Sequence, residues 1–131
     1  MSWPTRDEAL KLLHEWTESE SLRRHGYCVE SAMRAYARLR GADAEQWGVT
    51  GLLHDFDYEK HPALPEHPTK GCEVLRAAGY PEEMIAAILG HAGLAPRESE
   101  MARTLFAVDE LCGFLTACSY VQPTRKIAEA K

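Results

Sequence analysis

Apolar residues recur along the chain with the spacing of one face of an α-helix. Between Arg6 and Glu18–Ser19 they fall three or four positions apart and form a single stripe: Ala9, Leu10, Leu12, Leu13 and Trp16. A second stripe extends from Ser21 to Arg40, and Gly41 follows it as a residue suited to end a helix. No segment alternates apolar and polar residues, and no Asn-Gly or Asp-Gly hairpin turn occurs. The pattern predicts an all-α protein.

Turn-forming residues divide the remainder of the chain. Asp43 is placed to cap a third helix that ends around Asp55–Phe56, and prolines then predict a loop over residues 57–68. Further helices are expected over residues 68–78, 81–91 and 99–120, and a last short helix after Pro123. The helix over 99–120 is apolar on all sides, which is typical of a central, mostly buried element. We therefore expect residues 1–131 to form one domain, a bundle of six to seven helices.

Charge and hydropathy restrict the possible partners. The net charge is -5, and the few basic clusters are surrounded by acidic residues, so a nucleic-acid polymer is not expected as a ligand. A small phosphorylated molecule beside a bound cation remains compatible with this charge. No apolar run approaches the roughly 20 residues of a membrane span, and the first residues lack a secretory signal. These features predict a cytoplasmic protein without a membrane partner.

Cysteine usage points to packing rather than to metal binding. The four cysteines, Cys28, Cys72, Cys112 and Cys118, form no CxxC pair, and each lies among apolar residues of a predicted helix. We expect reduced, buried thiols that behave as small apolar side chains.

The pair His54-Asp55 stands at the end of an apolar helical run. An unpaired buried carboxylate costs several kcal/mol, so Asp55 should be paired or bound to a metal. Asp109 lies inside the most apolar helix, where it is either a partner in a buried salt bridge or a cation ligand. His25 lies near the apolar stripe of the second helix, as a core histidine or as a further ligand. Such a mixed nitrogen and oxygen set suits Mn, Fe, Ni, Co, Zn or Mg.

These residues together resemble the HD superfamily of metal-dependent phosphohydrolases, in particular its HDIG-type branch. The similarity covers about residues 20–115, so a single HD-type domain is implied. The usual Ile-Gly after the HD pair is replaced by Phe56-Asp57, as in a small uncharacterised subgroup, and the substrate is therefore open. The segments that carry the resemblance are Gly51-Leu52-Leu53-His54-Asp55, His67 to Leu75, Ile85 to His91, and Ala107-Val108-Asp109-Glu110-Leu111.

The resemblance implies a site for one or two divalent metal ions. The first ion would be held by His25, His54, Asp55 and Asp109. His67 and His91 would hold a second ion, with Asp55 bridging the two. If only one ion binds, these two histidines would instead face the substrate phosphate. From the residues alone, His67 is equally compatible with an exposed loop histidine and His91 with a histidine that stabilises a helix end.

The implied activity is hydrolysis of a small phosphate ester or nucleotide by a metal-activated water. We expect Asp55, Asp57 and Lys70 to act in catalysis. Asp57 or Glu59 could accept a proton or orient the water, or be solvated loop carboxylates, and the candidate phosphate contacts are Lys60, Lys70, Arg23 and Arg24. Two alternatives remain, a di-iron HD-type oxygenase and a non-catalytic metal-binding module. A small helical bundle is also compatible with pairing into a homodimer.

Overall fold

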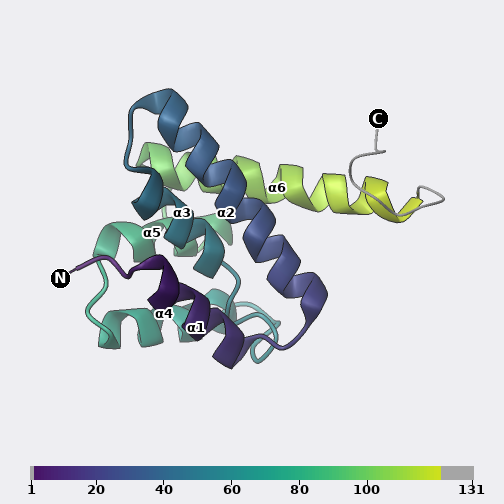
Figure 1. Cartoon of the computed structure of the whole chain (residues 1–131). Coiled ribbons are helices and arrows are strands. Elements are labelled where there is room, and N and C mark those ends of the chain that lie inside the picture. The colour runs from purple at the N-terminus through teal and green to yellow at the C-terminus, as the bar shows by residue number, and fades with distance from the viewer. Residues whose placement is uncertain (1, 122–131) are drawn as a thin grey trace.

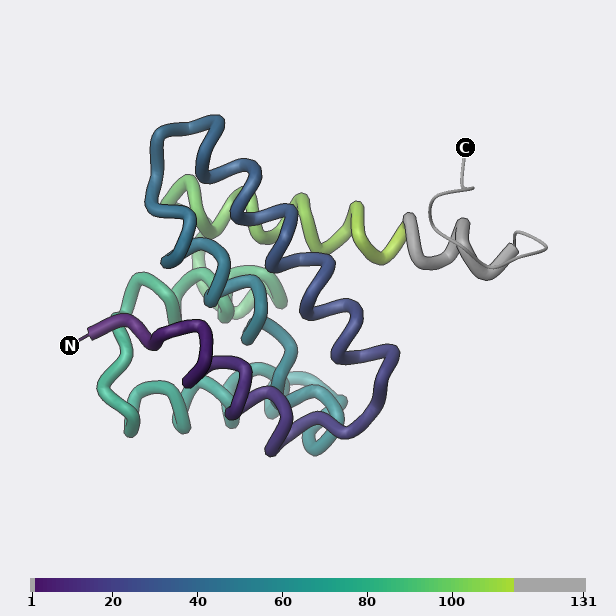
Figure 2. The backbone as a smooth tube through the Cα atoms, in the orientation of Figure 1, coloured from purple at the N-terminus to yellow at the C-terminus, as the bar shows by residue number. Residues whose placement is uncertain are grey.

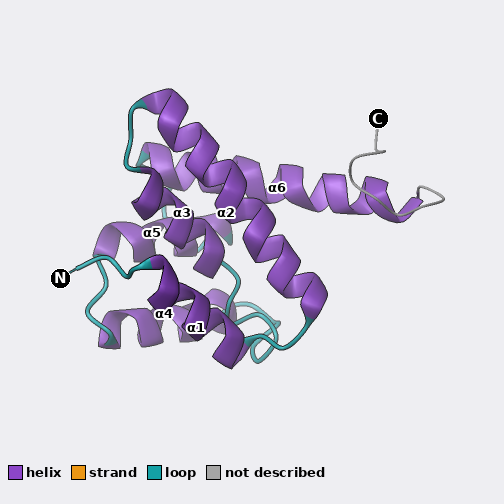
Figure 3. Ribbon diagram, viewed as in Figure 1, coloured by secondary structure: helices purple, strands orange, loops and turns teal. Residues whose placement is uncertain are grey.

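A computed structural model describes residues 2–121, and the side chains of residues 2–114. This part of the chain is helical and contains no strand, which confirms the all-α prediction (Figure 3). The predicted short helix after Pro123 lies outside the described residues. The helices are α1 (Arg6–Trp16), α2 (Glu20–Arg40), α3 (Ala44–Leu53), α4 (Glu66–Ala77), α5 (Glu82–His91) and α6 (Glu100–Val121).

Side chains at the helix starts satisfy backbone N–H groups that have no partner inside the helix. Thr5 and Glu8 form a reciprocal capping box at the start of α1. Asp43 accepts hydrogen bonds from the N–H groups of Glu45 and Gln46, as expected for the cap of α3. The predicted end of α2 at Gly41 is also confirmed, because Gly41 adopts a left-handed conformation with φ 69°.

Helix α3 is the central element of the fold. It packs against α1, α2 and α5, and its residues from Trp47 to Leu53 are all buried (Figure 1). Gly51 allows α2 to approach closely, because a Cβ atom there would lie 2.9 Å from Cγ of Met33 and 3.1 Å from the carbonyl oxygen of Val29. The close pairing of α2 and α3 is visible in the backbone trace (Figure 2). It brings the end of α3 beside the middle of α2.

The end of α1 and the start of α4 differ from the boundaries predicted from the sequence. Helix α1 ends at Trp16, before the predicted Glu18–Ser19. The Thr17 hydroxyl donates to the carbonyl of Phe56, and the Glu59 carboxylate accepts from the N–H groups of Glu18 and Ser19, so this segment is held as a turn into α2. Helix α4 includes Glu66 and His67, although the backbone at His67 is not helical.

The prediction of a mostly buried last helix is wrong at Leu111 and Phe114 of α6. Leu105, Val108 and Cys112 are buried, but Phe114 is 63% exposed and Leu111 44% exposed. The C-terminal end of α6 extends beyond the other helices (Figure 1). Apolar composition favours burial, but a side chain is buried only where another helix packs against it. Cys112 contacts Cys28 of α2, whereas Leu111 and Phe114 on other sides of α6 stay exposed.

The described helices also bear on membrane association. None of them combines the length and the apolarity that crossing a bilayer would require.

Candidate metal centre

Four polar side chains from three parts of the fold converge beside the end of α3. His25 comes from α2, His54 and Asp55 follow the last turn of α3, and Asp109 comes from α6. Oδ1 of Asp109 lies 2.8 Å from Nε2 of His25 and 3.2 Å from Nε2 of His54. The Nε2 atoms of His25 and His54 are 3.1 Å apart, and Oδ2 of Asp55 lies 3.3 Å from Nε2 of His54. The four residues predicted for a first ion are therefore brought together.

A second group shares Asp55 with the first. Oδ1 of Asp55 lies 3.0 Å from Nε2 of His67 and 3.1 Å from Nε2 of His91, while its Oδ2 faces His25 and His54. One carboxylate thus presents one oxygen to each group, which is the arrangement of a bridging ligand. The ligand atoms of each group lie within 4.8 Å of one another. His67 and His91 are not solvated: their side chains are 9% and 5% exposed.

Hydrogen bonds at helix ends orient two of the histidines. Nδ1 of His54 lies 2.6 Å from the carbonyl oxygen of Gly51, and Nδ1 of His91 bonds the carbonyl of Ile88. Carbonyls in the last turn of a helix lack an intrahelical partner, so a histidine three residues later can donate to them. Because Nδ1 must carry the proton, Nε2 presents a lone pair toward the cluster in the neutral ring. The fold thereby fixes the tautomer that a metal ligand needs.

The donor set requires positive charge at its centre. Imidazole lone pairs and carboxylate oxygens otherwise face one another at contact distance, with His54 fully buried. Two ligand atoms bonded to one ion at about 2.1 Å lie about 3.0 Å apart at right angles and about 3.4 Å apart in a tetrahedron. In the first group the five distances that involve a histidine range from 2.8 Å to 3.6 Å. The spacing therefore fits a first-row divalent cation, and Asp109 pairs with histidines rather than with an arginine or lysine.

The pKa values of the cluster report the same need for positive charge. Burial favours the neutral imidazole of His54, but the charges of Asp55 and Asp109 outweigh it and raise its pKa well above the usual value. Burial likewise disfavours the Asp55 carboxylate, yet His54, His67 and His91 hold its pKa well below the usual value. Without a metal, a proton on His54 would offset the charge of the Asp55 and Asp109 carboxylates. A divalent cation would replace that proton.

Asp57 lies behind His67 rather than on the open side of the cluster. Its side chain is 1% exposed, its Oδ1 lies 2.6 Å from Nδ1 of His67, and its Oδ2 accepts a bond of 2.8 Å from the N–H of Gly71. A carboxylate that holds the second nitrogen of a metal-binding histidine is a common outer partner in metal sites. The expectation that Asp57 contacts water or substrate does not match this placement.

Gly71 makes room for the Asp57 carboxylate. A Cβ atom at this position would lie 2.8 Å from both Cγ and Oδ2 of Asp57 and 2.8 Å from Cε1 of Phe56. We expect Gly71→Ala to displace Asp57 and His67, to destabilise the fold by about 1–3 kcal/mol, and to weaken the second ion about 10–100-fold. Thermal unfolding and metal titration measure these effects.

Gly113→Ala is the matched control for this substitution, because a Cβ atom there meets nothing within 4 Å. The control should bind metal as the parent chain does. Equal second-ion affinity in Gly71→Ala and Gly113→Ala would contradict the role assigned to Gly71.

The other polar residues predicted for the site have separate contacts. Glu59 holds the turn before α2, and Nζ of Lys60 lies 4.4 Å from the ring centroid of Trp16. Arg23 donates to the carbonyls of Thr17 and His14. The remaining two candidates, Lys70 and Arg24, are exposed, and Lys70 forms no ion pair with the side chains that the structure describes. None of these basic groups contacts the cluster.

The sequence patterns missed the outer partners of the histidines. The acceptors at Gly51 and Ile88 are backbone carbonyls, and a histidine placed in the last turn of a helix is the only sequence signal for them. The role of Gly71 depends on the distance to Asp57, which no periodicity records.

Comparison with known proteins agrees with this geometry. The model of the HD domain family matches residues 22–113, which is most of the chain. The chain therefore belongs to the HD domain family, and the resemblance to the HD superfamily inferred from its sequence is confirmed. The histidine–aspartate cluster contains groups able to hold metal ions, which is consistent with an HD-domain metal site. No solved structure matches the chain.

Proposed function

We propose that this protein hydrolyses a phosphate ester in a small molecule or nucleotide, using a water molecule activated by one or two divalent cations. The observation that carries the proposal is the position of Asp55. Its two carboxylate oxygens face two separate groups of imidazole nitrogens at 3.0–3.6 Å. A pair of cations held so close together could contact both the attacking and the leaving oxygen of a phosphoryl group.

The chain's own residues supply position and charge. Six side chains hold the cations, and Asp57 keeps the His67 ring oriented toward Asp55. A bound divalent cation lowers the pKa of its water and offsets negative charge on phosphoryl oxygens. The cluster reaches the surface at Asp55 and Asp109, whose side chains are 22% and 26% exposed.

The proposed substrate is small. The net charge of -5 opposes binding of a long polyanion, whereas a single phosphate group would be attracted by the cations themselves. Tyr58 offers an apolar surface for the organic part, since its ring is 5.3 Å from that of His67 and the residue is 40% exposed. These two observations favour a nucleotide or a similar phosphorylated compound.

Metal analysis combined with a phosphatase assay tests the proposal. The protein is purified without chelator, its metal content is measured, and p-nitrophenyl phosphate and nucleotides are assayed with added Mn and Ni. We expect turnover that disappears after chelation and returns with metal. A chain that binds metal but hydrolyses none of a broad panel of phosphate esters would contradict the proposal.

A di-iron oxygenase is a second candidate, favoured by the presence of all six ligands around one shared carboxylate. It would contain two iron ions per chain and hydrolyse no phosphate ester. A non-catalytic module would hold its metal without exchange and lose helical structure on chelation. Both outcomes are read from the same metal and activity measurements.

A further inference from the structure

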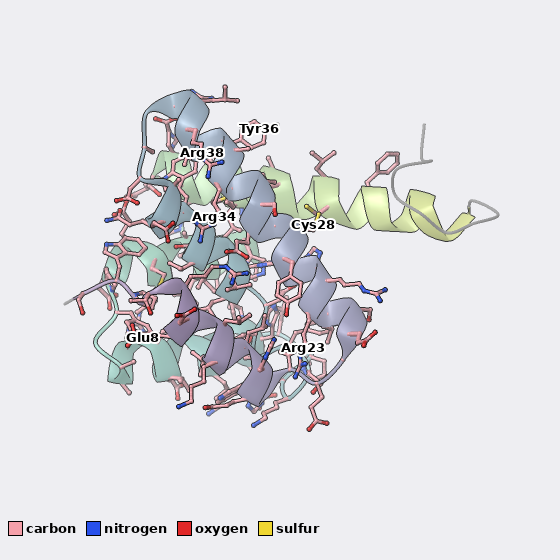
Figure 4. All side chains as sticks on the ribbon, in the orientation of Figure 1. Glu8, Arg23, Cys28, Arg34, Tyr36 and Arg38 are labelled. Atoms are coloured by element: carbon pink, nitrogen blue, oxygen red, sulfur yellow. The ribbon has the colours of Figure 1, made fainter. Side chains whose placement is uncertain are left out.

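Two cysteines from helices far apart in sequence meet in the fold. Cys28 lies on α2 and Cys112 on α6, 84 residues later, and their sulfur atoms are 2.7 Å apart. Figure 4 shows the sulfur of Cys28 where α2 passes α6. Both cysteines are free thiols. A disulfide needs a sulfur separation of about 2.05 Å, so small side-chain adjustments would bring these two atoms to bonding distance.

The cysteine pair lies directly next to the metal centre. Cys28 follows His25 by three positions on α2, and Cys112 follows Asp109 by three positions on α6. Three residues correspond to nearly one helical turn, so each cysteine shares a helix face with a ligand of the first group. The contact between Nε2 of His25 and Oδ1 of Asp109, at 2.8 Å, is therefore repeated one turn along as a contact between two sulfurs.

We propose that Cys28 and Cys112 form a reversible disulfide, a redox-responsive cross-link between α2 and α6 beside the metal centre. Formation of the bond does not depend on the proposed function. It goes beyond the reduced, buried thiols expected from the sequence, because the fold pairs two of them face to face.

The oxidation is balanced with a peroxide as the oxidant. The Cys28 sulfur attacks one peroxide oxygen and becomes a sulfenic acid, while the other oxygen leaves as water. The Cys112 sulfur then attacks the Cys28 sulfur, the S–S bond forms and a second water leaves. Two thiols lose two hydrogens, and hydrogen peroxide is reduced to two water molecules. A dithiol reductant reverses the reaction by thiol–disulfide exchange.

Burial sets the order and speed of these steps. Cys28 is partly exposed, whereas Cys112 is 2% exposed. Burial, together with the contact to Cys28, raises the pKa of the Cys112 thiol far above its usual value. Because the thiolate is the nucleophile, we expect Cys28 to react first and the overall oxidation to be slow at neutral pH and faster at alkaline pH.

Mass spectrometry of the metal-free, full-length chain tests the cross-link. After treatment with hydrogen peroxide, we expect an intact mass lower by two hydrogens. When the free thiols are then blocked, two of the four cysteines should carry the blocking group, and digestion should give a peptide containing Cys28 joined to Cys112. Dithiothreitol should restore the original mass. Cys28→Ser and Cys112→Ser should each prevent the bond, whereas Cys72→Ser should not, since Cys72 contacts no other sulfur among the described side chains.

Three outcomes would overturn the proposal. They are the absence of any disulfide, a disulfide that includes Cys118 in place of either cysteine, and oxidation to sulfinic acid without cross-linking. Because Cys112→Ser alters a buried site, circular dichroism must show that this variant is folded. If Cys112→Ser does not fold, loss of the disulfide is tested with Cys28→Ser alone.

A second measurement tests the effect on the metal centre and rests on metal binding at His25 and Asp109. The cross-link restricts separation of α2 and α6, so we expect the melting temperature to rise by on the order of 10 °C. Metal release to a chelator should slow several-fold in the oxidised chain and not in oxidised Cys28→Ser. Equal release rates from the oxidised and reduced chains would overturn the coupling to the metal centre.

Discussion

Replacing Asp55 with alanine is expected to abolish binding of both ions and all turnover. Asp55 is the one residue shared by the two groups, with Oδ2 facing His25 and His54 and Oδ1 facing His67 and His91. Loss of an outer partner already weakens metal binding 10–100-fold in known sites, so loss of a bridging ligand should weaken it by more than about 100-fold. Metal content per chain and the phosphate-ester assay measure the two effects.

Asp55→Asn tests whether the negative charge of the Asp55 side chain, and not only its size, is needed for metal binding. The amide retains the size of the side chain but cannot provide two anionic oxygens, so it should behave as Asp55→Ala does. Asp7→Ala is the control, because Asp7 is an exposed carboxylate in the first turn of α1, away from the cluster. Full metal content in either Asp55 variant, with helical content unchanged, would contradict the bridging role.

The helices were predictable because their signals are local. Apolar stripes with helical spacing define the buried faces of α1 and α2, and Asp43 and Gly41 mark boundaries through the chemistry of their own positions. The exposure of α6 was not predictable in this way. Leu111 and Phe114 are as apolar as Leu105, and only the tertiary arrangement determines which of them acquire neighbours.

The six candidate ligands were predicted from the order and spacing of histidines and aspartates along the chain and from the family resemblance. The chemistry of each residue alone does not identify it as a ligand. A buried aspartate such as Asp109 can pair equally with an arginine or with a metal, and the fold decides between these by placing His25 and His54 against it. The position of Asp57 is a long-range property, since its partners His67 and Gly71 lie beyond a proline-rich loop. Adjacency to the HD pair favoured a direct role in chemistry, whereas burial gives Asp57 a role through His67.

Replacing His67 with alanine is expected to lower metal stoichiometry from two ions per chain to one. His67 contacts the shared ligand Asp55 and its outer partner Asp57, and it belongs to the second group only. The first ion should therefore remain. His14→Ala is the control, because His14 is an exposed histidine whose Nε2 contacts only the Tyr27 hydroxyl. His25→Ala should give the converse result and weaken the first ion. Metal analysis after gel filtration measures all three.

The pH dependence of binding provides an independent measure of the same assignment. Burial lowers the pKa of His67, but Asp55 and Asp57 outweigh burial and raise it to about 9. In the metal-free protein His67 is therefore protonated at neutral pH, and the second ion must displace that proton. Second-ion affinity should rise up to about tenfold per pH unit between pH 7 and pH 9, with proton release that diminishes across this range.

His67→Ala removes both the ligand of the second ion and the proton that competes with it. Binding of the first ion to this variant should therefore lack the rise in affinity between pH 7 and pH 9. A different result would assign His67 to the substrate phosphate. In that case the wild-type protein binds one ion, His67→Ala still binds that ion, and the KM of the variant for a phosphate ester is raised. A variant that still binds two ions with the wild-type pH profile would exclude both roles, because neither the ligand nor the proton would then belong to His67.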